Sequence, residues 1–211
     1  MATPSFMDTL VLGVDRVLKT LARTTRAERP SPGQEVEDVS LSETDTRHAA
    51  GLMRVNHTGE ICAQAMYEGQ ALVARDGRVK AALLDAAREE EDHLAWCDER
   101  LDQLDSKPSV LNPVWYGLSY ALGAATGLMG DKISLGFVAA TEDQVCKHLE
   151  SHLEKLPADD ARSRRIVEQM RADEARHGTN ARRAGGVEFP APVKDVMSLI
   201  SKLMTETSYR G

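Results

Sequence analysis

Apolar residues recur every three or four positions along most of this chain, which is the spacing of one face of an α-helix. The pattern predicts helices over residues 46–74, 77–105, 132–155, 159–183 and 193–207, and another over 6–22. Turn-forming residues separate several of them: Asp76-Gly77, Pro157 with Asp159, and Gly185-Gly186. Runs of β-branched residues are missing, so we expect an all-α protein.

The first 43 residues are predicted to form an N-terminal amphipathic helix and a linker. One stripe of residues 6–22 is apolar, whereas Arg16, Lys19 and further arginines make this end locally basic. Such a helix can lie on an anionic membrane surface, or it can dock on its own core or on a partner subunit. Residues 23–43 combine prolines, glycine and mixed charges, which is typical of a linker or a meandering loop.

A long uncharged stretch runs from Pro108 to Gly130 and holds 23 residues. By length it borders on a transmembrane segment, but prolines near its start shorten the helical part to about 18 residues, near the lower limit for a span. We therefore expect a crossover helix with an apolar face, either buried in the fold or dipping into one leaflet. Trp115, Tyr116 and Tyr120 at one end suit the interface level of a bilayer.

Composition narrows the function classes. A formal net charge of −7 argues against a nucleic-acid-binding protein, which usually carries a basic face. The three cysteines form no CxxC motif and are an odd number, which suits reduced core thiols in a cytosolic compartment. The first residues have no basic region before an apolar block, so no signal peptide is predicted.

Two short stretches repeat one chemical pattern. Residues 89–93 and 173–177 each hold a Glu and a His three positions apart, which places both side chains on one helix face. A lone Glu lies 30 residues before the first pair and 32 before the second, on a face of small or apolar residues. The candidate metal ligands are therefore Glu60, Glu90, His93, Glu142, Glu174 and His177.

The helical pattern predicts that these six residues meet. The four glutamates lie 13 to 17 residues from the nearest predicted turn, so antiparallel hairpins bring all of them to one level, about 20–25 Å from the turns. A Glu from each of two helices plus Glu-x-x-His from each of two others is the ligand set of di-iron and di-manganese carboxylate bundles with one crossover. Without thiolate ligands, a structural zinc or iron–sulfur site is not expected. Solvated charged faces are the alternative, but the apolar flanks argue against it.

Further residues are candidates for contacts to the ligands. Asp173 and Glu89 each precede a ligand Glu and could accept the second N–H of a ligand His, or they could be plain surface acids. Tyr67 could hydrogen-bond a ligand or gate electrons, or it could be a core tyrosine. His148 lies on the flank of the Glu142 face, where it could touch the ligands or remain a surface residue.

The segment from Asn56 to Ala65, together with the two repeated stretches and Thr141-Glu142, resembles the Coq7 family of demethoxyubiquinone (3-demethoxyubiquinol) hydroxylases. The resemblance covers residues 44–211 and implies a ferritin-like di-iron hydroxylase domain whose two irons are bound by the six candidate ligands. It further implies a monooxygenase that uses O₂ and an electron donor to hydroxylate a polyprenylated demethoxy-benzoquinol in ubiquinone biosynthesis. His148 is followed by Leu149, so the His-Tyr pair of some members is incomplete here.

The resemblance also implies a peripheral protein on the cytoplasmic side of the inner membrane, as a homo-oligomer or within a ubiquinone-biosynthesis complex. A polyprenyl substrate is insoluble in water, so the enzyme should meet it at a membrane. The uncharged stretch and the amphipathic terminal helices offer a surface for that contact. Three other functions remain alternatives: a ferritin-like iron-handling protein, a peroxide-removing di-metal enzyme and a metal-free membrane scaffold. Storage would need a shell of many subunits, against which the uncharged crossover argues.

Overall fold

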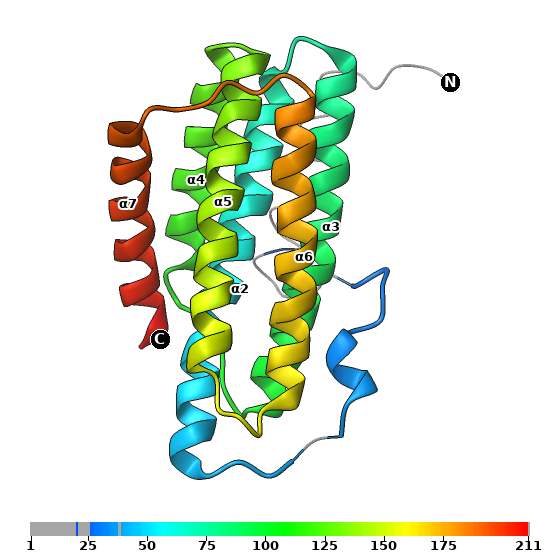
Figure 1. Ribbon diagram of the computed structural model, residues 1–211, viewed down its shortest axis with the longest axis vertical. Helices are drawn as coiled ribbons and strands as arrows, with labels where there is room; N and C mark the ends of the chain where they lie inside the picture. Colours follow the sequence, from blue (N-terminus) through cyan, green and yellow to red (C-terminus); the bar gives the residue numbers. More distant parts are fainter. Residues whose placement is uncertain (1–19, 21–25, 38, 211) are drawn as a thin grey trace.

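The computed structural model describes Thr20, residues 26–37 and residues 39–210, and the described chain contains helices and no strand (Figure 1). The helices are η1 (Pro32–Glu35), α2 (Glu43–Val73), α3 (Gly77–Gln103), α4 (Asn112–Leu128), α5 (Asp131–Lys155), α6 (Ala161–Arg183) and α7 (Ala191–Tyr209). The all-α prediction is confirmed, and the described helices of the bundle begin and end within a few residues of the predicted bounds.

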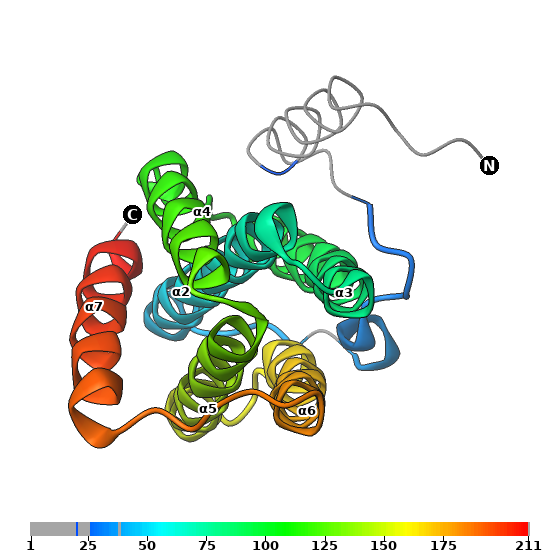
Figure 2. The same ribbon diagram turned by 90° about the horizontal axis from the view of Figure 1, so that it is seen from above.

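Four long helices form the bundle as two antiparallel hairpins, α2 with α3 and α5 with α6. Seen from above, they surround a common axis, and α4 and α7 lie outside on the side of α2 and α5 (Figure 2). Side-chain caps fix three of the helix starts, because Ser42, Asp76 and Asp160 each accept a backbone N–H of the first turn. Packing is closer within each hairpin than between the hairpins.

The hydrophobic core inside the bundle has two main parts along its length, and a smaller third cluster lies between α2, α3 and α4. One part contains Met53, Trp96, Leu101 and Met170, together with other apolar residues near one end of the four helices. The other contains Tyr67, Leu83, Val138, Ala181 and their neighbours near the opposite end. The six candidate ligands lie between these two parts along the sequence of every helix, so apolar packing on both sides positions a polar layer.

Helix α4 is the predicted crossover, and it packs along α2 at very short range. A Cβ at Gly123 would overlap the backbone of Met66, and one at Gly69 would overlap the backbone of Tyr120. Tyr116 turns inward and donates to Glu68 Oε2 at 2.6 Å, so it does not take the interfacial position that the sequence suggested. Among the described helices, none combines the length and the apolar character required to cross a bilayer.

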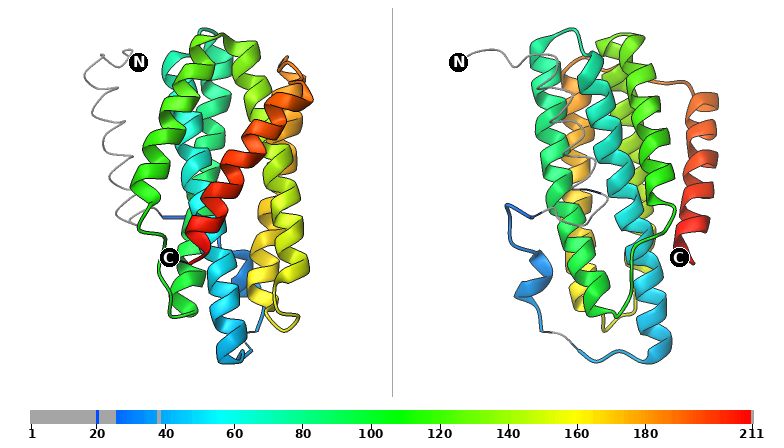
Figure 3. Two further views of the ribbon diagram at one scale, coloured as in Figure 1. Left: turned by 90° about the vertical axis from the view of Figure 1, so that its left-hand side faces the viewer. Right: turned by 180° about the vertical axis from the view of Figure 1, so that it is seen from behind.

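Helix α7 crosses the outer face of α2 and α5 obliquely and is fastened at its end (Figure 3). The Tyr209 hydroxyl lies 2.7 Å from His48 Nδ1, and Arg54 donates to the Tyr209 carbonyl at 2.8 Å. The ring of Tyr209 rests on Gly51, where a Cβ would come within 2.6 Å of it. These contacts hold α7 on the bundle although much of its apolar side remains exposed.

The predicted helix over residues 6–22 lies outside the described residues except for Thr20, whose hydroxyl donates to Gln64 Oε1 at 2.8 Å. Residues 26–37, which we name the N-terminal strap, are irregular apart from η1. The strap runs along α3 and α6 (Figure 2). Gly33 fits closely against Ile166, and Arg162 donates to the Val36 carbonyl at 3.1 Å.

Candidate metal centre

All six candidate ligands come together at one level inside the bundle, and none of them is more than 6 % exposed. Their ligand atoms form two groups, each with every atom within 4.8 Å of the others. The first group is Glu60, Glu90, His93 and Glu174, and the second is Glu142, Glu174 and His177. The similar distances of the four glutamates from their predicted turns thus predicted that residues up to 117 positions apart would meet.

Glu90 and Glu174 lie between the two histidines. His93 Nδ1 is 3.0 Å from Glu90 Oε2 and 3.0 Å from Glu174 Oε1. His177 Nδ1 is 3.0 Å from Glu174 Oε2 and 3.4 Å from Glu90 Oε1. Each of these carboxylates therefore turns one oxygen to each histidine, which is the arrangement of a carboxylate that bridges two cations.

The remaining two glutamates complete the two halves of the site. Glu60 Oε2 is 3.3 Å from His93 Nδ1. Glu142 belongs to the group of His177 and accepts a hydrogen bond from the Tyr67 hydroxyl. We define the His93 half as Glu60 and His93, and the His177 half as Glu142 and His177, with the two central carboxylates shared.

The residues present fit a pair of divalent cations. Glu142 Oε2 is buried without a hydrogen-bond partner, a costly state for an oxygen atom that carries charge. Four buried carboxylates need compensating positive charge, and two divalent ions would balance them. The donor set of carboxylate oxygens and imidazole nitrogens suits iron or manganese.

The pKa values of the candidate ligands reflect the same excess of buried negative charge. Burial, together with neighbouring carboxylates, raises the pKa of Glu60 and of Glu142 well above the ordinary range. Burial would lower the pKa of His177, but hydrogen bonds to Glu174 and Glu90 outweigh it and raise that pKa to about 12. In this protein, protons therefore compensate the carboxylates wherever metal cations do not.

The outer nitrogen of each histidine is held by an acid from the opposite Glu-x-x-His helix. His93 Nε2 lies 3.1 Å from Asp173 Oδ2, and His177 Nε2 lies 3.1 Å from Glu89 Oε2. Both contacts fix the imidazole so that Nδ1 faces the central carboxylates, the usual role of a carboxylate behind a ligand histidine. Residue order alone suggested Asp173 and Glu89, whereas their crossed pairing required the packing of α3 against α6.

The other two candidate residues have different surroundings. Tyr67 is fully buried at the metal level, and burial with nearby carboxylates raises its pKa well above the usual value, so it stays a hydrogen-bond donor to Glu142. His148 lies in a cavity beside Glu60, packs against His152 with the two rings tilted and 3.9 Å between their centroids, and has a buried Nε2 without a partner.

Two residues at the site were not identified from the sequence. Asp92 lies in a run of charged residues, 88–92, which is typical of a solvated helix face, but it is only 4 % exposed, because Arg29 of the strap covers it. Arg29 also contacts Asp173. An arginine in a predicted linker gives no signal of such a role, and only its position in the folded chain reveals it.

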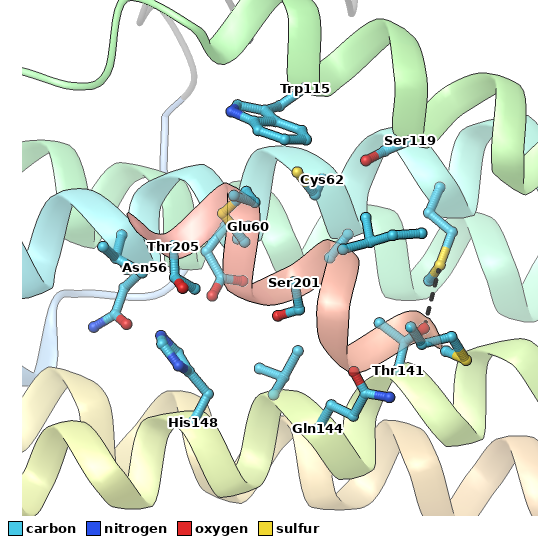
Figure 4. A pocket seen from close by; sticks show the side chains of 18 of the residues that line it. Asn56, Glu60, Cys62, Trp115, Ser119, Thr141, Gln144, His148, Ser201 and Thr205 are labelled. Atoms are coloured by element: carbon cyan, nitrogen blue, oxygen red, sulfur yellow. Dashed lines mark hydrogen bonds between the residues drawn. The ribbon is translucent and has the colours of Figure 1, made fainter. Parts of the chain in front are cut away.

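A cavity of about 160 Å³ borders the metal centre between α2, α4, α5 and α7. Glu60 and Asn56 lie in its wall with His148, and α7 crosses in front of them (Figure 4). Most of its lining is apolar, including Met66, Leu122, Phe137, Ile200 and Met204. We name this space the apolar cavity. Leu122 and Ile200 line it and are also 43 % and 51 % exposed, so it opens between α4 and α7.

Comparisons with known proteins show similarity over nearly the whole chain. A family model described as "Ubiquinone biosynthesis protein COQ7" matches residues 47–208. Relatives named 3-demethoxyubiquinol 3-hydroxylase include one from Pseudomonas paraeruginosa, 58 % identical over 205 residues, which cover 97 % of this chain and 95 % of the relative. Another, from Azotobacter vinelandii, is 57 % identical over 207 residues, which cover 98 % and 96 %. A third, from Stutzerimonas stutzeri, is 59 % identical over 204 residues, which cover 96 % and 95 %.

Proposed function

The chain belongs to the COQ7 family of ubiquinone biosynthesis proteins, and we propose that its metal centre binds two iron ions for the reaction of that family. The chain is an oxidoreductase that hydroxylates a ubiquinol precursor, the activity for which its relatives are named. The observation that carries the di-iron part of the proposal is the placement of Glu90 and Glu174, each with one oxygen toward each histidine.

The reaction requires O₂, two electrons and two protons. One oxygen atom replaces a ring hydrogen by a hydroxyl group, and the other leaves as water with two protons and with two electrons from a donor. Two iron ions, when bound, supply the redox chemistry that activates O₂.

The side chains of this protein hold and orient the site. Glu60 and Glu142 are proposed as the ligands of one ion each, and Glu90 and Glu174 as ligands shared by both. Asp173 and Glu89 keep the two imidazole rings turned inward. The Tyr67 hydroxyl holds Glu142 in place. The two hydrophobic core parts exclude water from both ends of the site.

The apolar cavity is the proposed site of the quinol. Its apolar lining suits a prenyl chain, and Glu60 in its wall places the ring beside one metal position. Asn56 Oδ1 and His148 Nε2 are buried without partners and could accept hydrogen bonds from ring hydroxyl groups. Burial lowers the pKa of His148 to about 4, so this imidazole is neutral near pH 7 and can accept.

We further propose that the chain binds peripherally to the cytoplasmic side of the inner membrane. Val114 and Leu118 of α4 and Leu199 and Leu203 of α7 are each more than half exposed, and both helices flank the opening of the apolar cavity. A lipid surface against these helices would let a polyprenyl substrate enter the cavity without crossing water.

A single-turnover experiment tests the proposal. The protein is loaded anaerobically with Fe(II), mixed with a demethoxyubiquinol in lipid vesicles, and exposed to ¹⁸O₂. We expect two irons per chain and a hydroxylated quinol that carries one ¹⁸O atom. A protein that binds two irons and consumes O₂ but leaves the quinol unchanged would contradict the reaction. Rapid destruction of hydrogen peroxide in its place would support the peroxide-removing alternative.

A further inference from the structure

The N-terminal strap reaches the metal centre through one residue, Arg29. Its Nε donates to Asp92 Oδ2 at 2.5 Å, and its Nη1 donates to Asp173 Oδ2 at 2.9 Å. The backbone N–H groups of Glu28 and Arg29 donate to the other oxygen of Asp92 at 2.6 and 3.2 Å. The Arg29 carbonyl accepts from Trp96 Nε1 at 3.1 Å, and the guanidinium lies 4.9 Å from the centre of that ring.

Asp173 connects Arg29 to the His93 half of the site. A single oxygen, Oδ2, faces both Arg29 Nη1 and His93 Nε2. The other oxygen, Oδ1, accepts from Arg176 at 2.8 Å and from Gln169 at 3.3 Å. Arg29 is thus the arginine that holds the oxygen on which the orientation of His93 depends.

The two halves of the metal centre differ in this respect. His177 is backed by Glu89, which pairs with Arg176 of the bundle at 2.7 Å. His93 is backed by Asp173, whose inner oxygen pairs with an arginine from outside the bundle. Without Arg29, His93 would be the one remaining partner of Asp173 Oδ2 among the described residues, whereas Oδ1 would keep Arg176 and Gln169, which favours a rotation of the carboxylate away from His93.

We propose that Arg29 is a positioning residue for the His93 half, and that the strap is therefore part of the metal centre. The inference rests on the proposed function only as far as the cluster binds two metal ions. Loss of Arg29 weakens binding of the ion held by Glu60 and His93 and spares the ion held by Glu142 and His177.

A titration with Co(II), a divalent probe with visible absorption, tests this inference on the full chain. In the wild-type protein we expect two Co(II) ions per chain. In Arg29→Gln we expect one of the two binding steps to weaken about tenfold, the lower end of the effect of outer partners on metal affinity. Arg29→Lys should recover part of the lost Co(II) affinity, because lysine keeps the positive charge. The recovery should be incomplete, because lysine lacks the forked geometry of the guanidinium group.

Matched variants identify the half that is affected. Arg88→Gln removes an arginine that lines the same surface depression but pairs with Asp85, and it should leave both binding steps unchanged. Glu89→Gln should weaken the other step, and the double variant with Arg29→Gln should weaken both. Circular dichroism of the metal-free variants tests whether the helices are retained.

The outcomes separate the two proposals. A wild-type protein that binds no Co(II) would overturn both the metal centre and the inference. Two tight Co(II) ions in both wild-type and Arg29→Gln proteins would overturn only the role of Arg29. Equal weakening of both steps, or the same loss in Arg88→Gln, would reduce Arg29 to a general structural residue.

Discussion

At the scale of single residues, unsatisfied polar atoms in otherwise apolar surroundings mark where a ligand fits. Asn56 is 2 % exposed, its Oδ1 lacks a partner, and it lines the apolar cavity beside Glu60. A buried amide oxygen without a partner costs stability that a substrate hydroxyl can recover. Such an atom is better explained by substrate binding than by folding.

Replacing Asn56 tests that explanation. Asn56→Ala removes the acceptor, so a ring hydroxyl of the bound quinol would be left unpaired. We expect KM for the quinol to rise about tenfold, equivalent to about 1.4 kcal/mol, with iron content unchanged. Steady-state kinetics with metal analysis provide both readouts. An unchanged KM would remove Asn56 from the substrate site.

A second residue-scale prediction concerns His152, which is buried against His148. Burial and the neighbouring His148 lower its pKa to about 2. The unfolded chain takes up this proton below about pH 6.5 and the folded protein does not, so stability is lost as the pH falls through that value. Near pH 5 the loss is about 2 kcal/mol.

The variant His152→Gln has no such proton to take up. Urea unfolding of the metal-free protein at pH 7.5 and 5 should show a loss of stability on acidification that is about 2 kcal/mol smaller than in the wild type. Parallel pH dependence of the two proteins would mean that His152 titrates normally in the fold.

At the scale of elements, glycines determine how closely α4 approaches α2. Gly123 and Gly117 lie on the same helix and differ in surroundings, because a Cβ at Gly123 overlaps the Met66 backbone and one at Gly117 meets nothing within 4 Å. We expect Gly123→Ala to lose about 1–3 kcal/mol through overpacking. Gly117→Ala should gain about 0.5–1 kcal/mol from helix propensity. Denaturant unfolding of both variants measures the contrast, and equal effects would contradict the close approach.

The exposed faces of α4 and α7 form the proposed membrane contact. The double variant Leu199→Glu/Leu203→Glu loses two exposed apolar side chains. We therefore expect it to bind neutral phosphatidylcholine vesicles at least tenfold more weakly than the wild type does. Lys202→Glu on the same helix changes the net charge by the same two units and should bind as the wild type does. Vesicle co-sedimentation measures binding. A similar loss in both variants would point to charge and not to the apolar face.

At the scale of the whole molecule, the proposed metal centre joins the two hairpins, whose backbones approach each other less closely than the helices within each hairpin do. Its candidate ligands come from all four bundle helices. Metal ions that bind only the folded state stabilise it by about 2.7 kcal/mol each at 100 times their dissociation constant.

Metal removal should therefore lower the melting temperature. For a chain of this size, about 1 kcal/mol corresponds to 2–4 °C, so we expect the chelator-treated protein to melt about 10 °C or more below the anaerobic Fe(II) form. Differential scanning calorimetry measures the shift. Equal melting temperatures with two irons bound would show that the ions do not link the hairpins.

The apolar periodicity of the chain was sufficient to predict the helices. The positions of six residues on the apolar stripes were sufficient to predict that the proposed ligands meet. Helix geometry is local and regular, so spacing in the sequence translates directly into face and height. The burial of Asp92 has no signal in its own helix, because the strap that covers it comes from 63 residues earlier in the chain. The inward turn of Tyr116 likewise depends on Glu68 of another helix.

The sequence by itself determined the helical fold, the family resemblance and the candidate ligand set, since these depend on residue types at helical spacing. Only the tertiary structure decided that Asp173 backs His93 and Glu89 backs His177, that Arg29 reaches Asp173, and that a cavity opens between α4 and α7. These features arise where elements distant in the chain pack together, and no local pattern encodes which side chains then face each other.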